Sequence, residues 1–164
     1  MNYQTPIFRR RPKDEATFIN SIKDIYCAEK NLVKALPKMY KAASSEDLAV
    51  ILEKNLAQTH EHIIRLEDVF KIMGIEAEPA EQCSVMDQIL YETSTIIKNK
   101  KDCPVCNALI ASTKKAELYK IASYWSLIQL AKKIGKTEVA QIFDKTLQQG
   151  IETDKALTNL TGKA

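Results

Sequence analysis

Six polar or ionisable side chains interrupt the apolar stripes of the helices that we expect in this sequence of 164 residues. They are Glu29, Gln58, His62, Glu117, Lys120 and Asp154. Each falls near the middle of a long helix, in register with residues that face the core. Burying a charge is costly unless the charge is paired or bound to a metal ion. We therefore expect one polar site inside a helical bundle, with Tyr26 and Tyr124 packed in the bundle and hydrogen-bonded to that polar layer.

A metal ion is one hypothesis for what this site holds. Carboxylate oxygens and imidazole nitrogens are ligands for iron and manganese. The candidate ligands are Glu29, Gln58, His62, Glu117 and Asp154. Bundles that hold two metal ions typically carry Glu-x-x-His motifs, and this sequence has none. Three carboxylates and one histidine would hold at most one divalent ion well.

Lys120 supports the opposite hypothesis, in which no cofactor is bound. Its ammonium group could lie among the carboxylates of Glu29, Glu117 and Asp154 and take the place of a metal cation. At ~4 Å, an ammonium group and a carboxylate attract each other by several kcal/mol at an effective dielectric constant near 20. We favour this metal-free core and keep iron or manganese binding as the alternative.

Two closely spaced thiols form a second candidate site. Cys103 and Cys106 make a Cys-x-x-Cys unit at the start of a predicted helix, where the thiol pKa is lowered. This spacing occurs in redox and zinc sites. One hypothesis is that the two thiols form a redox switch. The alternative is that they are incidental thiols at a junction between a loop and a helix. Zinc would need two more ligands, and Cys83 is the one further thiol near the linker.

Composition and periodicity together predict the elements that position these residues. Only 4 Gly and 5 Pro occur, which favours an all-α protein. Apolar spacing and stop signals predict long helices over 14–43, 46–73, 104–134 and 137–160, with a shorter helix over 84–97. Residues 1–13 read as a flexible N-terminal arm, followed by one domain over 14–164. The connectivity predicts a ferritin-like four-helix bundle with an extra short helix in the crossover.

Charge and hydropathy exclude several other classes of protein. The 24 basic and 21 acidic residues give a net charge of +3, which is too balanced to predict a nucleic-acid partner. The apolar stretch over 121–131 is far shorter than the ~20 residues of a membrane span. No signal peptide is visible, so we expect a cytoplasmic protein with reduced thiols. No phosphate-binding loop or nucleophile elbow appears.

Several sequence segments resemble the bacterial YciE/YciF stress-protein family in order and spacing. These segments are 24–30, 34–39, 65–70, 83–86, 121–124 and 154–158. The resemblance covers roughly residues 14–160. It implies a ferritin-like bundle, a homodimer and a link to stress responses, and it brings no established reaction.

The sequence departs from this family where potential metal ligands are expected. Gln58 replaces one of two adjacent glutamates, Lys120 stands in place of an acidic residue, and Gln149 and Gly150 replace a glutamate pair. The resemblance therefore implies a stress-associated protein with a degenerate metal site. The alternatives are a non-haem iron or manganese protein in oxidative-stress protection, and a dimeric protein-interaction module.

Overall fold

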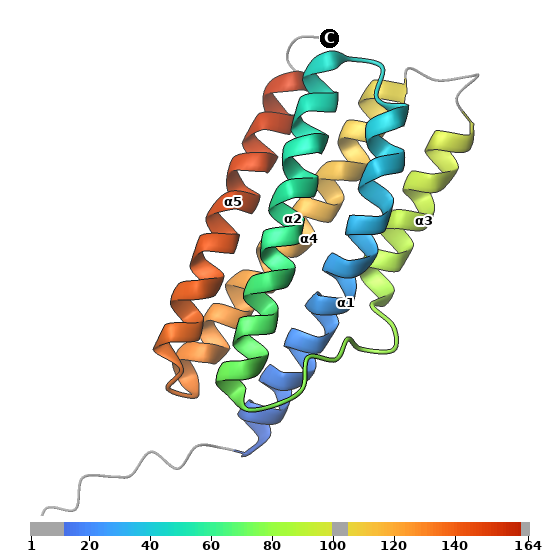
Figure 1. The fold of residues 1–164 in the computed structure, drawn as a ribbon. Helices are drawn as coiled ribbons and strands as arrows, with labels where there is room; N and C mark the ends of the chain where they lie inside the picture. Colours follow the sequence, from blue (N-terminus) through green and yellow to red (C-terminus); the bar gives the residue numbers. More distant parts are fainter. Residues whose placement is uncertain (1–11, 100–104, 162–164) are drawn as a thin grey trace, which may run out of the picture.

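The computed structural model describes residues 12–99 and 105–161, which form five α-helices and no β-strand (Figure 1). The helices are α1 (Pro12–Ala42), α2 (Glu46–Met73), α3 (Ser84–Lys98), α4 (Val105–Lys133) and α5 (Thr137–Thr161). The predicted all-α class and the short helix in the crossover are both confirmed. The first eleven residues of the predicted arm lie outside the described residues.

Local signals in the sequence set the helix ends. The Ser45 side chain accepts a hydrogen bond from the backbone N–H of Leu48 and caps α2. Gly74 and Gly135 follow α2 and α4 with φ angles of 70° and 76°, a left-handed conformation that glycine adopts without a Cβ clash. The first helix starts at Pro12, two residues before the predicted start, because proline is well suited to the first turn of a helix.

The four long helices surround one core, with α1 beside α2, α2 beside α5, α5 beside α4, and α4 beside α1. The short helix α3 packs on α1 and α4, outside this group of four (Figure 1). The crossover between α2 and α3 is tied to α1, because the backbone N–H of Ala80 donates to the carbonyl of Lys23 at 3.0 Å. None of the helices in the described part of the chain is long and apolar enough to cross a membrane.

A layer of polar side chains divides the buried core into two apolar halves. One half includes Phe18, Ile22, Leu66, Tyr124 and Phe143. The other includes Leu32, Leu36, Leu48, Leu52 and Leu157. Between them lies what we call the polar layer, which comprises Glu29, Asn55, Gln58, Thr59, His62, Thr113, Glu117, Lys120 and Thr153. Every long helix contributes to this layer, and the partly buried Leu90 of α3 packs against both apolar halves.

Candidate functional site

Glu29 lies at the centre of the polar layer, and three side chains from two other helices converge on its carboxylate. Its Oε1 accepts a hydrogen bond from the Tyr124 hydroxyl at 2.8 Å and lies 3.2 Å from His62 Nδ1. Its Oε2 lies 3.2 Å from the ammonium nitrogen of Lys120. This contact is an ion pair, because Oε2 accepts no hydrogen bond of good geometry. Glu29 is fully buried, so these contacts must replace all of its hydration.

Lys120 lies between the two buried carboxylates and is only 2% exposed. Its Nζ is 3.6 Å from Glu117 Oε1, one turn before it on α4, and 3.5 Å from His62 Nδ1. Glu117 also accepts a hydrogen bond from the Asn55 side chain at 3.0 Å. We call Glu29, His62, Glu117 and Lys120 the charge cluster. It joins α1, α2 and α4 through side chains alone.

A glycine allows α5 to close over the charge cluster. A Cβ at Gly150 would lie 3.3 Å from the Ile121 side chain and 3.7 Å from Glu117 Oε2. The first of these distances is tighter than an ordinary van der Waals contact. The absence of a side chain at residue 150 therefore lets α5 approach the carboxylate of Glu117 closely.

The second nitrogen of His62 connects the cluster to α5. His62 Nε2 lies 3.0 Å from the Gln149 side-chain oxygen, which also accepts from Arg65 at 2.6 Å. The Gln149 amide nitrogen donates to Glu61, which fixes the orientation of this amide. The Nδ1 atom lies between Glu29 Oε1 and the Lys120 ammonium group, so both ring nitrogens of His62 have protein partners.

The charges of the cluster support one another electrostatically. Burial alone raises the pKa of Glu29, but Lys120, His62 and Tyr124 outweigh it and lower this pKa from 4.5 to about 2. Burial alone lowers the pKa of Lys120, whereas Glu117 and Glu29 raise it above its ordinary value. Both groups are therefore ionised at neutral pH. The pKa of Tyr124 is raised by burial and by Glu29, so its hydroxyl stays a donor.

The structure brings together most, but not all, of the predicted site residues. Four of them lie together in the charge cluster, namely Glu29, His62, Glu117 and Lys120. The Tyr124 hydroxyl donates a hydrogen bond to Glu29. Gln58 is buried in the same layer, where it accepts a hydrogen bond from Thr153.

Asp154 and Tyr26 are corrections to the sequence-based prediction. The Asp154 carboxylate is partly exposed and bound by Lys114, one turn along α4 from the cluster. Gly150 and Thr153 take the inward positions of α5 instead. Tyr26 packs in the core but donates its hydroxyl to Glu67, away from the polar layer. The predicted thiol pair of Cys103 and Cys106 lies outside the residues whose side chains the structure describes.

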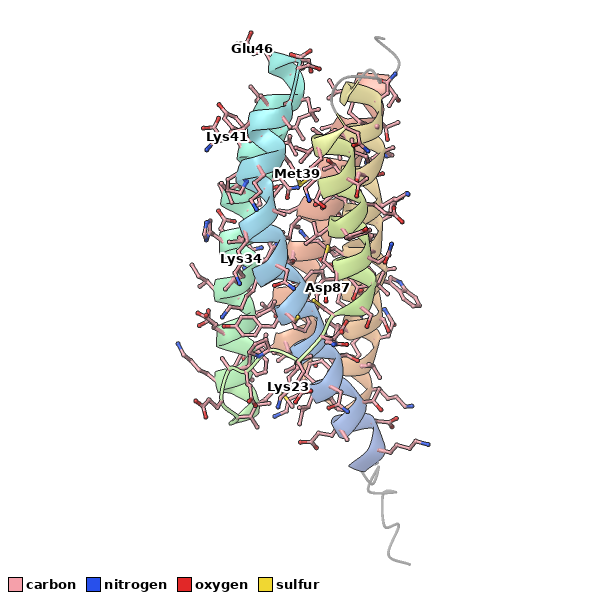
Figure 2. All side chains as sticks on the ribbon, turned by 90° about the vertical axis from the view of Figure 1, so that its right-hand side faces the viewer. Lys23, Lys34, Met39, Lys41, Glu46 and Asp87 are labelled. Atoms are coloured by element: carbon pink, nitrogen blue, oxygen red, sulfur yellow. The ribbon has the colours of Figure 1, made fainter. Side chains whose placement is uncertain are left out.

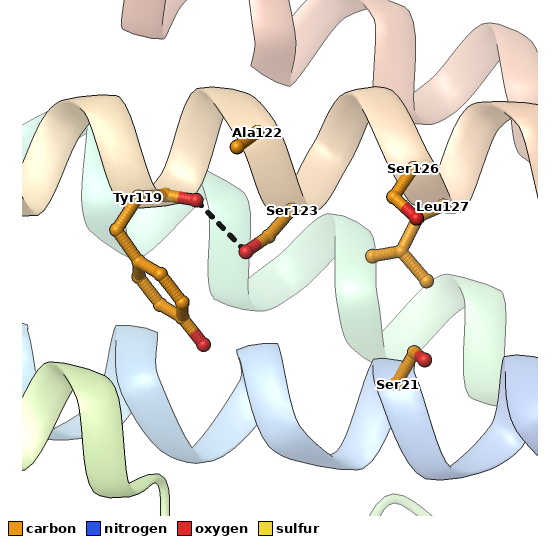
Figure 3. A pocket seen from close by; sticks show the side chains of 6 residues that line it. All are labelled: Ser21, Tyr119, Ala122, Ser123, Ser126 and Leu127. Atoms are coloured by element: carbon orange, nitrogen blue, oxygen red, sulfur yellow. Dashed lines mark hydrogen bonds between the residues drawn. The ribbon is translucent and has the colours of Figure 1, made fainter.

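Arg65 is a contact that sequence reasoning missed, and Gln149 was noted only as the replacement of a family glutamate. They stand at the edge of the apolar stripes of α2 and α5, and only the packing of these two helices shows that they meet. An open cavity of about 330 Å³ between α1 and α4 is lined by none of the predicted site residues (Figure 3). Its lining consists of Ser21, Tyr119, Ala122, Ser123, Ser126 and Leu127.

The charge cluster does not fit a bound metal ion. The ammonium group of Lys120 lies where a cation would bridge Glu29 and Glu117. The two ring nitrogens of His62 already have protein partners, because Nδ1 faces Glu29 and Lys120 and Nε2 faces the Gln149 oxygen. Across residues 12–99 and 105–161, no group of three or more His, Cys, Asp and Glu side chains is placed to hold a metal ion.

Comparison with known proteins identifies the family of this chain. Residues 13–164 match the family described as a domain of unknown function, DUF892. The chain is 34% identical to protein YciF of Escherichia coli (strain K12) over 147 residues, which cover 89% of each sequence.

Two solved structures are similar over nearly their whole length. The crystal structure of the E. coli stress protein YciF has a TM-score of 0.85 and 33% identity, covering 92% of this chain and 95% of YciF. YcfI of Rhodopseudomonas palustris has a TM-score of 0.84 and 27% identity, covering 93% of this chain and 96% of YcfI. The chain therefore belongs to the DUF892 family and is a relative of YciF.

The cluster predicts a large loss of stability when its internal cation is removed. A Lys120→Met substitution leaves Glu29 and Glu117 buried without their ammonium partner, and we expect the free energy of unfolding to fall by about 3–5 kcal/mol. Urea unfolding followed by circular dichroism measures this change. The matched control is Lys115→Met, since Lys115 is an exposed lysine of the same helix, and its unfolding midpoint should hardly move. A Lys120 variant as stable as this control would contradict the cluster.

The low pKa of Glu29 predicts a specific loss of stability in acid. Because this pKa is lower in the folded than in the unfolded chain, the stabilisation is complete above about pH 4.5 and disappears as the pH falls towards 2. The expected change is on the order of 3 kcal/mol. Urea unfolding between pH 7 and pH 2 should show the free-energy difference between wild type and Glu29→Gln shrinking below pH 4.5. A difference that stays constant over this range would contradict the low pKa.

Proposed function

We propose that this DUF892 protein is a stress-associated, ferritin-like protein in which an internal lysine replaces a metal ion. The observation that carries the proposal is the position of Lys120, which is buried between Glu29 and Glu117 and 3.5 Å from His62. An ammonium group provides one positive charge and three donors, so it holds the helices together without a metal supply. It offers no oxidation state to change, and the charge cluster therefore has a structural role.

The link to stress rests on the relative, since E. coli YciF is described as a stress protein. We infer that the chain contributes to the same kind of response as a stable helical bundle. The abundance of the protein, measured by quantitative mass spectrometry in its own cells after peroxide, salt and heat treatment, tests this role. We expect it to rise under at least one treatment, and a constant level under all three would contradict the stress role.

Metal content tests the structural role of Lys120 directly. We expect wild-type protein, produced in iron- and manganese-replete medium without chelator, to contain far less than one metal ion per chain by inductively coupled plasma mass spectrometry. The Lys120→Glu variant should gain iron or manganese, because the substitution removes the internal cation and adds a carboxylate ligand beside Glu29, Glu117 and His62.

A lysine on the exposed face of the same helix provides the matched control. Lys115→Glu makes the same change in net charge away from the cluster, and its metal content should equal that of wild type. Near-stoichiometric metal in the wild type would overturn the proposal. A folded Lys120→Glu variant with no more metal than Lys115→Glu would show that Lys120 does not stand in for a metal ion.

A further inference from the structure

Two buried thiols, one in α1 and one just before α3, face each other outside the charge cluster. Cys27 lies in the middle of α1, and Cys83 is the residue that precedes α3. Both are free, and their sulfur atoms are 2.6 Å apart. A disulfide bond is 2.03–2.05 Å long, so bond formation needs a movement of only about half an ångström. We propose that Cys27 and Cys83 form an oxidisable dithiol site, which peroxide converts to a disulfide that joins α1 to the start of α3.

Two polar residues connect this pair of thiols to the surface. The Asn31 side-chain nitrogen lies 3.3 Å from the Cys83 sulfur and 3.8 Å from the Cys27 sulfur, and it donates to Asp87 at 2.8 Å. The Cys83 thiol also faces the Asp87 carboxylate at 3.4 Å. Asp87 is exposed and lies where α3 faces α1 (Figure 2). A single layer of side chains therefore separates the thiols from the solvent. In this layer the Asn31 amide is a hydrogen-bond donor and the Asp87 carboxylate is a proton acceptor.

The two thiols have different surroundings and therefore different roles in the proposed oxidation. Cys27 is 7% exposed, whereas Cys83 is fully buried. Burial, followed by the contacts with Cys27 and Asp87, raises the pKa of Cys83, so this residue keeps its proton. Cys27 is therefore the thiol that meets the oxidant, and Cys83 is the one that resolves the product.

The proposed oxidation balances with hydrogen peroxide as the oxidant. The Cys27 sulfur attacks one peroxide oxygen, the O–O bond breaks, and the departing hydroxide takes the Cys27 proton and leaves as water, so that a sulfenic acid remains on Cys27. The Asn31 amide group is placed to donate to the new oxygen. The Cys83 sulfur then attacks the Cys27 sulfur, the S–O bond breaks, and the departing hydroxide takes the Cys83 proton by way of Asp87. Two thiols and one peroxide give one disulfide and two waters.

The disulfide would reinforce the connection between the crossover and α1. This connection already contains the hydrogen bond from Ala80 to Lys23 and an exposed ion pair of Lys23 with Glu78. A covalent bond between residues 27 and 83 closes a loop of more than fifty residues in the unfolded chain, which stabilises the folded state. We expect the midpoint of thermal unfolding to rise by about 5–10 °C on oxidation.

Peptide mapping of the folded full-length chain tests the proposal. The protein is treated with hydrogen peroxide in native buffer, remaining thiols are blocked with N-ethylmaleimide in denaturant, and trypsin is added. We expect one linked product of peptides 24–30 and 72–98, lighter by two hydrogens than the separate peptides and released by dithiothreitol. Cys103 and Cys106 share a different peptide, 102–114, so their oxidation is read separately.

Three variants distinguish this site from other thiol chemistry. The Cys103→Ser/Cys106→Ser double variant should give the same linked product and the same rise in thermal midpoint, and the Cys27→Ser variant should give neither. Cys83→Ser should accumulate a sulfenic acid on Cys27 that dimedone captures. The proposal is overturned if both thiols stay free, if the link forms only in denaturant, or if Cys27 reacts with peroxide without forming the link.

Discussion

The ion pair between Glu29 and Lys120 is the interaction on which the rest of the bundle depends. Each of these groups would lose several kcal/mol of hydration on burial, and each recovers it only because the other is present. Glu117, His62 and Tyr124 complete the arrangement, and they come from the helices that flank α1. The charge cluster thus requires α1, α2 and α4 to be in register, whereas the hydrophobic contribution of the apolar contacts on either side is non-directional.

The division of the core follows from this requirement. Apolar side chains fill the space on both sides of the polar layer, with Phe143 and Leu66 on one side and Leu52 and Leu157 on the other. Buried charges need polar partners at the same level, so each long helix carries polar residues at that level. The glycine at residue 150 belongs to the same constraint, because a side chain there would meet Ile121 beside the Glu117 carboxylate.

Helical periodicity was sufficient to predict four members of the cluster but not their exact neighbours. Glu29, His62, Glu117 and Lys120 stand in the middle of apolar stripes, so their inward direction follows from a repeat of 3.6 residues. Asp154 stands at the edge of the apolar stripe of α5, where a small rotation of the helix decides whether a side chain faces the core or the surface. In the structure its carboxylate forms an ion pair with Lys114. The predicted helices agree with the structure to within two residues because Ser45, Gly74 and Gly135 mark their ends. The meeting of Cys27 with Cys83 could not be predicted, because it depends on how the crossover lies against α1.

The two chemical sites of the molecule use opposite sides of one helix. Successive residues on an α-helix are rotated by about 100° about the helix axis. Glu29 is therefore rotated by roughly 200° from Cys27, whereas Asn31, one turn after Cys27, lies on the same side of the helix as Cys27. The inner side of α1 holds the charge cluster that joins the long helices, and the outer side holds the thiols and the amide group that contact α3. Oxidation of the thiols would therefore fix the position of α3 and leave the charges of Glu29 and Lys120 unchanged. The proposed roles of the two sites thus differ, since the lysine would hold the long helices together by its charge and the dithiol of Cys27 and Cys83 would respond to oxidants.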